Sequence, residues 1–204
     1  MIIDTIGLDG ERGHDLLKGI IGPRPIAWIT SLHPNGVVNV APFSCFTFVA
    51  FKPMTVCLSF ERVAAGGDKK ATLRNIERTR EFVIHPATEQ LVHQVNDTSR
   101  HIPEMGDKLA SLGLATVPSE RVLVPRIEQC PIALECRLIE SRPLTQSNDL
   151  ILAEVVSVFL PDGLYQGSAI DYDAYRPVGR MHGDFYALPG KLVEIPRPWN
   201  RPGG

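Results

Sequence analysis

The sequence has neither a long apolar run nor a strong excess of either charge. No apolar segment approaches the roughly 20 residues of a membrane-spanning helix. Residues 1–14 lack the basic start and long apolar core of a signal peptide. A formal net charge of −2 and a pI near 6.3 leave no basic surface for nucleic acid or an anionic membrane. We therefore expect a cytoplasmic protein with no nucleic-acid or membrane partner.

The motifs of several large enzyme classes are also missing. The chain contains no GxGxxG after a strand, no GxxxxGK, no HExxH, no EF-hand loop and no GxSxG. These patterns build the phosphate, metal and nucleophile sites of Rossmann dehydrogenases, P-loop NTPases, zinc proteases, calcium sensors and α/β-hydrolases. Their absence removes the main sequence support for each of these classes.

Cysteine is scarce and unpaired in the sequence. The four cysteines are Cys45, Cys57, Cys130 and Cys136, and no two of them form a CxxC pair. Zinc sites need closely paired ligands, whereas a free cysteine packs as a small hydrophobic side chain. We expect reduced, buried cysteines and no metal site. Cys45 is the exception to watch, because it lies inside the candidate ligand segment described below.

Length and composition are those of one ordinary globular domain. The chain has 204 residues, of which 44% are hydrophobic and 22% charged, so it can bury one substantial core. All-β domains of this size are commonly single units. We therefore treat residues 1–204 as one domain.

Residues 22–44, GPRPIAWITSLHPNGVVNVAPFS, organise the rest of the chain. Pro34, Asn35 and Gly36 separate two β-prone runs, and Asn-Gly accepts the positive φ of a hairpin turn. The first run, residues 26–32, is apolar on both alternating faces, which is typical of a strand covered on both sides. Its last hydroxyls, Thr30 and Ser31, can either meet a polar ligand or satisfy the turn's backbone.

The second run of this hairpin ends in small and hydroxyl side chains. They are Asn39, Ala41, Pro42 and Ser44. Such residues leave the backbone bare, so the segment can lie flat against a planar heteroaromatic ligand.

The remaining chain reads as strands with a few short helices. Strands are predicted over residues 54–60, 81–86, 131–142 and 149–160, and helices after an Asp68 cap, over 88–95 after a Thr88 cap, and over 107–112. Residues 16–20 read as a short lead-in strand or a turn. The strand at 149–160 is apolar on both faces, so its outer face needs a helix or a second subunit as cover, and Glu154 needs a partner.

A lysine pair opens the helix that follows Asp68. Lys69, Lys70 and Thr72 lie in its first turn, where free N–H groups and the helix dipole favour an anion. The pattern fits either a phosphate site or a solvated amphipathic helix.

Three blocks of sequence carry a family resemblance. RPIAWITS with NVAPFSCF, KKATLRNIERTREFVIH at residues 69–85 and YRPVGRMHGDFYAL at residues 175–188 resemble the flavin reductase-like family, the flavoredoxin-type FMN-binding split barrels. The resemblance spans roughly residues 19–188. It implies a mainly β fold with a few helices, an FMN-binding split β-barrel with Greek-key connections of the PNP-oxidase-like type. Residues 189–204 would form an extended Pro- and Gly-rich tail.

The resemblance also implies a set of cofactor-binding residues. Around the flavin ring and ribityl chain they are Thr30, Ser31, Asn39, Ala41, Pro42 and Ser44. Lys70 and Thr72 would hold the phosphate, and Asn75 would hydrogen-bond the loop or the ligand. The family usually has Lys-Asp-Thr at this turn, but its Asp is Ala71 here, which leaves the phosphate contacts less defined.

The third block and one loop supply further candidates. Arg180 would hold a ring edge or the second substrate. His182 is a weak candidate for a proton donor, since the chemistry belongs to the cofactor and no catalytic residue is required. Arg100 and His101, in a polar loop, can contact a dinucleotide or an electron partner, or simply face solvent.

The function implied by the resemblance is electron transfer from NADH or NADPH to flavin, in a homodimer that binds FMN near its subunit interface. A nicotinamide would bind against an exposed flavin face, because the chain has no dinucleotide-binding motif of its own. Two alternatives stay open. One is a flavoredoxin-like carrier that keeps FMN bound and exchanges electrons with a protein redox partner, and the other is a flavin-binding barrel without redox turnover.

Overall fold

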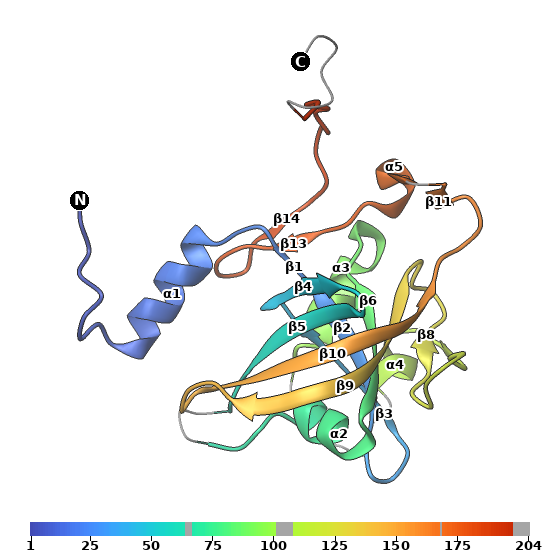
Figure 1. The fold of residues 1–204 in the computed structure, drawn as a ribbon, viewed down its shortest axis with the longest axis horizontal. Coiled ribbons are helices and arrows are strands. Elements are labelled where there is room, and N and C mark those ends of the chain that lie inside the picture. The colour runs from blue at the N-terminus through green and yellow to red at the C-terminus, as the bar shows by residue number, and fades with distance from the viewer. Residues whose placement is uncertain (64–66, 101–107, 168, 198–204) are drawn as a thin grey trace.

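The computed structural model describes residues 1–63, 67–100, 108–167 and 169–197. Its body is a seven-stranded antiparallel sheet with the strand order β3-β2-β6-β9-β10-β5-β4 (Figure 1). The strands are β2 (Ala27–Leu32), β3 (Val38–Phe43), β4 (Phe46–Phe51), β5 (Met54–Glu61), β6 (Glu81–Pro86), β9 (Ala133–Pro143) and β10 (Asn148–Phe159). The predicted mainly β fold is confirmed, and each of the strands predicted outside the hairpin is present.

The β2–β3 hairpin forms where the sequence predicts it. Its strands pair from Ala27 with Phe43 to Leu32 with Val38. The N–H of His33 donates to the carbonyl oxygen of Val37 at 2.9 Å and closes the turn. Gly36 lies in this turn at a φ of +82°, which a residue without a Cβ adopts readily.

Apolar clusters pack on both faces of β2, as its sequence pattern predicts. Ala27 and Ile29 belong to a cluster that includes the apolar face of α2 (Ala71–Thr79). Trp28 points to the opposite face, where its indole N–H donates to Thr98 Oγ1 at 2.8 Å. Because successive side chains of a strand alternate between faces, the middle of β2 is completely buried.

The outer face of β10 is only half covered. Ile151 and Ala153 are fully buried on the inner face, whereas Leu152 and Glu154 on the other face are partly exposed. Glu154 therefore remains in contact with water in the single chain, and its need for a partner beneath a covering subunit stays a prediction. The half-covered apolar face is the one that the sequence expects a helix or second subunit to cover.

The sequence does not predict the first helix. Residues expected to form a short strand or a turn belong instead to α1 (Gly10–Ile20), which projects from the body of the molecule (Figure 1). Asp9 begins this helix by accepting the N–H of Arg12 at 2.9 Å. No residue of α1 is buried.

One of the two predicted helix caps is wrong. The N-cap of α2 is Lys70 rather than Asp68, and no side-chain hydrogen bond caps this helix. Thr88 is the N-cap of the 3-10 turn η1 (Glu89–Leu91), which leads into α3 (Val92–Asp97), as predicted, although its side chain makes no capping hydrogen bond. The predicted helix at 107–112 contains α4 (Lys108–Ser111), and residue 107 lies outside the described residues.

Short elements complete the fold. They are the three-stranded sheet of β1 (Arg24–Pro25), β13 (Gly179–Arg180) and β14 (Tyr186–Ala187), the pairs β7 (Thr116–Val117) with β8 (Arg126–Ile127) and β11 (Tyr165–Gln166) with β12 (Ala169–Ile170), and α5 (Tyr172–Tyr175). Residues 189–197 have no regular structure and are mostly exposed, as the tail prediction expects. Within the described ranges, no helix is long and apolar enough to cross a bilayer.

Candidate functional site

Strand β3 lies at an edge of the main sheet, and β2 is its one partner among the described strands. The bond between His33 and Val37 makes them a hydrogen-bonded pair, and by alternation so are the pairs at positions 31/39 and 29/41. The backbone groups of Val40 and Pro42 therefore point away from β2. Pro42 is tolerated there because its missing N–H removes no bond from the ladder. Val40 is completely buried and Pro42 is half-buried, so the accessible main chain of this edge is the stretch around Pro42.

A buried polar network joins this edge to the start of α2. Asn39 Nδ2 donates to Ser31 Oγ at 3.3 Å and to Thr72 Oγ1 at 2.9 Å. Asn75 Nδ2 donates to the same Ser31 oxygen at 3.2 Å and lies 3.4 Å from Nδ1 of His33. All five side chains are nearly or completely buried. The network fixes the first turn of α2 against the hairpin, and it unites four residues that the sequence singled out separately.

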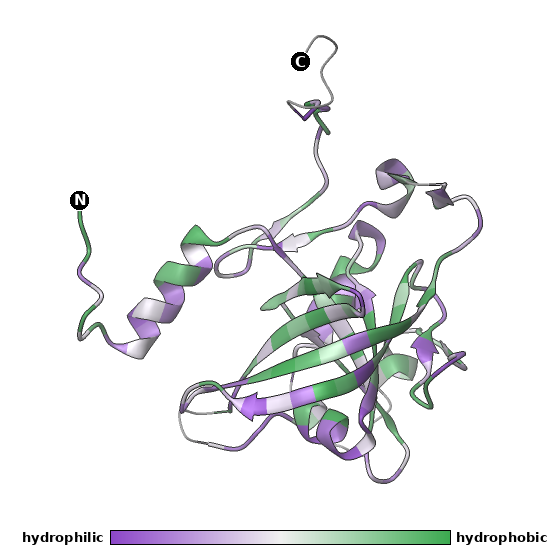
Figure 2. Cartoon of the chain, viewed as in Figure 1, coloured by the Kyte–Doolittle hydropathy of each residue, from purple (hydrophilic) through white to green (hydrophobic). Residues whose placement is uncertain are grey.

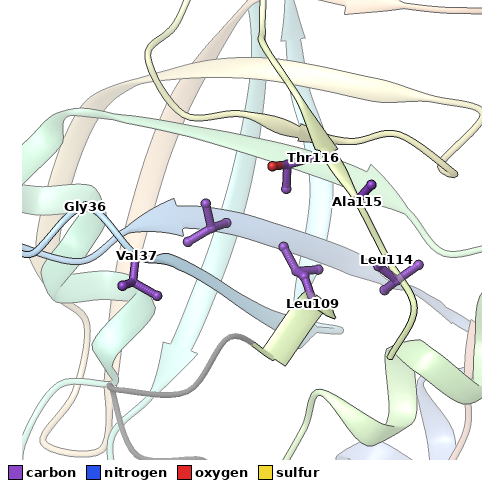
Figure 3. A pocket seen from close by; sticks show the side chains of 7 residues that line it. Gly36, Val37, Leu109, Leu114, Ala115 and Thr116 are labelled. Atoms are coloured by element: carbon purple, nitrogen blue, oxygen red, sulfur yellow. The ribbon is translucent and has the colours of Figure 1, made fainter. Parts of the chain in front are cut away.

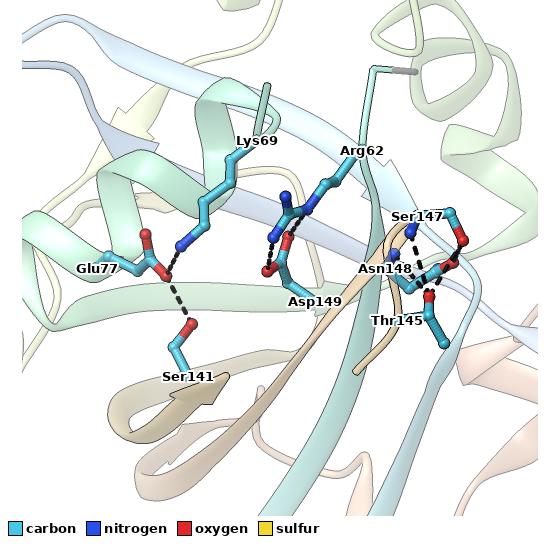
Figure 4. Close-up of polar contacts among 8 residues, drawn as sticks. All are labelled: Arg62, Lys69, Glu77, Ser141, Thr145, Ser147, Asn148 and Asp149. Carbon is cyan, nitrogen blue, oxygen red and sulfur yellow. Dashed lines mark hydrogen bonds and ion pairs between the residues drawn. The ribbon is translucent and has the colours of Figure 1, made fainter. Parts of the chain in front are cut away.

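The two adjacent lysines have different surroundings. Lys69 Nζ forms an ion pair with Glu77 Oε1 at 2.6 Å, and Ser141 Oγ donates to the same oxygen at 2.6 Å (Figure 4). Lys70 Nζ lies 5.9 Å from the centre of the Phe43 ring. Lys70 is therefore the lysine whose charge no carboxylate of the described residues neutralises. Together with the uncapped first turn of α2, it suits a phosphate group.

A bidentate ion pair anchors the segment that leads to these lysines. Arg62 donates to the carboxylate of Asp149 through Nε at 2.9 Å and Nη2 at 2.8 Å (Figure 4). The Asp149 side chain is 1% exposed, so this pair is largely shielded from water. The sequence analysis missed both residues; the one signal was an aspartate at the start of an otherwise apolar strand.

Arg24 is a third residue that sequence reasoning missed. It is 8% exposed, and its guanidinium donates to the carbonyl oxygens of Lys18 at 2.8 Å, Ile21 at 2.7 Å and Met181 at 3.0 Å. Its Nε lies 3.5 Å from Ser44 Oγ. This one side chain joins the end of α1, the turn after β13 and the end of the candidate ligand segment.

Other sequence candidates lie apart from the polar network. Thr30 points to the opposite face of β2, is fully buried and donates to the carbonyl oxygen of Pro125 at 2.8 Å. Ala41 and Pro42 are half-buried on the edge strand. Arg100 is exposed just after α3, and His101 lies outside the described residues.

The third sequence block forms the β13–β14 hairpin beside Arg24. Arg180 Nη2 donates to the carbonyl oxygen of Gly183 at 2.6 Å, and its guanidinium lies 4.5 Å from the centre of the Tyr186 ring. Its Nη1 is buried and has no hydrogen-bond partner among the described residues. His182 is half-exposed, with Nε2 3.8 Å from Asp15 Oδ1, and no nucleophile stands beside it among the described contacts.

The cysteines are all free thiols, but they are not all buried. Cys130 and Cys136 are buried, Cys57 is partly buried, and Cys45 is exposed. Burial raises the pKa of Cys130 to about 12. The expectation of a buried thiol is therefore wrong for Cys45, because this residue follows the end of the edge strand.

A cavity of about 440 Å³ lies at the tip of the hairpin (Figure 3). Its lining consists of Gly36, Val37, Val38, Leu109, Leu114, Ala115 and Thr116. The side chains of this lining are mostly aliphatic and none is charged, so the cavity does not suit a phosphate.

Known proteins resemble this chain over nearly its whole length. Residues 22–179 match the family model of the flavin reductase like domain. The structure of nitrilotriacetate monooxygenase component B from Bacillus cereus has 32% sequence identity and a TM-score of 0.90, covering 96% of this chain and 98% of that one. The structure of 2-nitrobenzoate 2-nitroreductase NbaA from Pseudomonas fluorescens has 26% sequence identity and a TM-score of 0.88, covering 99% of this chain and 98% of that one. A Shewanella frigidimarina protein with a split barrel domain, 18% identical, has a TM-score of 0.83 over 97% and 99% of the chains, which confirms the predicted split-barrel fold.

Proposed function

We propose, from the premise that this chain belongs to the family of flavin reductase-like domains, that it is an FMN-binding oxidoreductase that passes electrons from NADH or NADPH to flavin. Similarity to a monooxygenase component and to a nitroreductase supports a flavin-linked redox function. The choice of FMN and of a nicotinamide donor is our proposal. Free thiols, including the exposed Cys45, suit a reducing compartment, and we propose a cytoplasmic location.

One observation carries the proposal: the start of α2 is locked beside the free edge of β3. The network of Asn39, Ser31 and Thr72 holds an uncapped helix start next to outward-facing main-chain groups. A flavin mononucleotide has a planar ring with a hydrogen-bonding edge and a single phosphate at the end of a flexible chain. The accessible strand edge around Pro42 fits the ring, and Lys70 with the first-turn N–H groups fits the phosphate.

The chain's own residues would bind and orient this cofactor. When bound, FMN supplies the group that accepts a hydride and releases electrons. Lys70 would neutralise the phosphate, while the polar network keeps Thr72 and the first turn of α2 from shifting away from β3. Arg24 would hold Ser44 at the end of the ring segment. None of these roles requires a side chain to transfer a proton.

Paired lysine variants test the cofactor site. Lys70→Met should weaken FMN binding at least about tenfold, because a charge-assisted contact to phosphate is lost. Lys69→Met makes the same change of charge in the adjacent residue, whose ammonium is already paired with Glu77, and should have a smaller effect. Quenching of FMN fluorescence on titration with protein measures both. Equal affinity of Lys70→Met and the unchanged protein would contradict the phosphate assignment.

The electron donor is tested separately. The purified protein, loaded with FMN, is mixed with NADH or NADPH without oxygen, and the flavin absorption is followed. Rapid bleaching supports a reductase. Tight FMN binding without bleaching by either nucleotide would overturn the reductase proposal and favour a carrier with a protein redox partner.

We also propose a homodimer. Leu17, Ile20 and Ile21 of the projecting α1 segment are each more than half exposed, as are Phe48 and Phe51 at the other sheet edge. Figure 2 shows apolar residues on α1 and on the strands of the main sheet. Apolar exposure on this scale usually marks an interaction surface, and a second copy can cover it symmetrically.

Light scattering after size-exclusion chromatography tests this assembly. The unchanged protein should have the mass of two chains, and a Leu17→Asp, Ile20→Asp double variant should have the mass of one. A monomeric mass for the unchanged protein would refute the dimer.

A further inference from the structure

The cavity at the tip of the β2–β3 hairpin lies between two separate parts of the chain. One wall is the start of β3 with the turn before it, and the other runs from α4 to β7 (Figure 3). Leu109 and Leu114 are only 3% and 7% exposed, whereas Ala115 and Thr116 are exposed. The cavity therefore has an aliphatic inner end and a mouth that opens to solvent.

The main chain of Val38 faces away from the rest of the sheet. The bond from His33 to Val37 makes these residues a hydrogen-bonded pair, so the next pair, Leu32 with Val38, is a non-hydrogen-bonded one. The N–H and C=O groups of Val38 consequently point outward from β2. Since Val38 lines the cavity, this wall offers both a donor and an acceptor.

The same alternation applies to Thr116 on the opposite wall. The N–H of Glu128 donates to the carbonyl oxygen of Ala115 at 2.9 Å, which makes them the hydrogen-bonded pair of β7 and β8. Ile127, the direct partner of Thr116, donates its N–H at 2.9 Å to His85 instead. The main-chain groups of Thr116 therefore point away from β8.

The cavity thus combines neutral hydrogen-bonding groups with apolar walls. Within the described ranges, no hydrogen bond occupies the outward main-chain groups of Val38 or Thr116. Thr116 also carries the one polar side chain of the described lining, and no side chain of that lining is charged. An ion would lose its hydration here without gaining a counter-charge, so the lining favours an uncharged ligand.

The volume of the cavity limits the size of its ligand. A cavity of about 150 Å³ with apolar walls can hold benzene, whereas this one has about 440 Å³. Water can hydrogen-bond at the mouth, but the buried leucines at the inner end give it no partner. An apolar ring that displaces this water gains affinity.

The cavity is separate from the proposed flavin site. Val38 packs against the cluster that contains Trp28. Asn39, the next residue, points to the other face of the strand and donates to Thr72 at 2.9 Å. A ligand in the cavity and a flavin beside α2 would therefore lie on opposite faces of β3.

We infer that this cavity is a second binding site, which takes an uncharged aromatic molecule of one or two rings that carries a hydroxyl or amide group. The rings would pack on Leu109 and Leu114. The polar group would hydrogen-bond to the outward main chain of Val38 or Thr116. The inference goes beyond the proposed function and does not depend on it.

Three probes with the same two rings test this ligand chemistry: 2-naphthol, naphthalene and 2-naphthoate. Calorimetry with the purified protein should detect binding of 2-naphthol. The affinity for 2-naphthoate should be at least about tenfold lower, because its charge has no partner in the lining. Naphthalene should bind about twofold to tenfold more weakly than 2-naphthol, because it forgoes one hydrogen bond. No binding of 2-naphthol, or equal binding of 2-naphthoate, would overturn the inference.

A variant that fills the cavity tests the location. Ala115→Phe places a ring in the lining and should lower the affinity for 2-naphthol at least about tenfold. Ala174→Phe makes the same change at an exposed position of α5 and should bind 2-naphthol normally. Thr116→Trp is a second filling variant, to be used if Ala115→Phe does not fold. Undiminished binding of 2-naphthol by a folded filling variant would refute the assignment to this cavity.

Titration in the presence of FMN separates the two sites. Saturating FMN should leave the affinity for 2-naphthol unchanged, since the sites lie on opposite faces of β3. Displacement of 2-naphthol by FMN would place the probe in the flavin site and refute a second site. If the protein binds 2-naphthol in the cavity but does not bind FMN, the proposed function fails while the second site stands.

Discussion

His85 makes the stability of this protein depend on pH in a way that the structure specifies. The side chain is completely buried in β6, with Nδ1 3.0 Å from the carbonyl oxygen of Trp28. Its Nε2 lies 2.9 Å from the backbone nitrogen of Ile127. A backbone N–H can only donate, so Nε2 must be the unprotonated acceptor and Nδ1–H donates to Trp28. The contacts therefore require the neutral imidazole.

Burial lowers the pKa of His85 from the ordinary 6.5 to about 4, and the positive charge of Arg126 acts in the same direction. The carbonyl of Trp28 opposes the shift but does not outweigh it. Between these pH values the unfolded chain binds a proton that the folded chain does not. Stability from this group is therefore fully present above about pH 6.5 and is lost as the pH falls towards 4. The difference between the two pKa values corresponds to about 3 kcal/mol of unfolding free energy.

Urea unfolding at a series of pH values, at constant protein concentration, measures this effect. His85→Gln keeps an acceptor near Ile127 but replaces a buried ring, so it should be less stable than the unchanged protein at pH 7. Because glutamine does not titrate, the difference in unfolding free energy between the two proteins should narrow by about 3 kcal/mol on going to pH 4. His93→Gln, at an exposed position, is the control and should follow the unchanged protein throughout.

Carboxylates that titrate in the same range contribute equally to the unchanged protein and to His85→Gln, so the comparison cancels them. Parallel stability curves for the two proteins between pH 7 and pH 4 would refute the assignment of a buried, neutral His85.

Two other predictions address the site. The exposed Cys45 should react first with a disulfide reagent, and this fast phase should be removed by Cys45→Ser and slowed by bound FMN. Cys130, whose pKa is raised by burial to about 12, should react only on unfolding. A fast phase that survives Cys45→Ser would contradict this order. Asn39→Ala should lower the unfolding free energy by about 1–3 kcal/mol, because it leaves the buried hydroxyl of Thr72 without its amide donor and removes one of the two amide donors of Ser31. Ser99→Ala, at an exposed position, should cost less in the same urea titration, and equal losses would show that the network contributes little.

Several elements could be predicted because their signals are local. The Pro-Asn-Gly turn and the alternation on either side of it act between near neighbours, so the β2–β3 hairpin follows from the residues alone. The strands at β5, β6, β9 and β10 follow from the same kind of pattern. Helix α1 could not be found this way, since it buries no residue and its pattern therefore does not reflect packing.

The candidate site depends on contacts between distant parts of the chain. Ser31, Asn39, Thr72 and Asn75 could each be singled out from the sequence, but their hydrogen bonds to one another depend on α2 packing against the hairpin. The roles of the two lysines likewise depend on Glu77 and Ser141, which only the fold brings to Lys69. Arg24 was missed because its partners are main-chain oxygens, which leave no signal in the sequence.

The sequence by itself determined the hairpin, the mainly β architecture and the resemblance to a flavin-binding family, because turn preferences, alternation and local motifs are properties of neighbouring residues. Only the tertiary structure decided which lysine keeps its charge available, which polar side chains satisfy one another and which arginine nitrogen remains without a partner. Burial and hydrogen bonding determine these outcomes, and both depend on residues that are far apart in the chain and meet only when it folds.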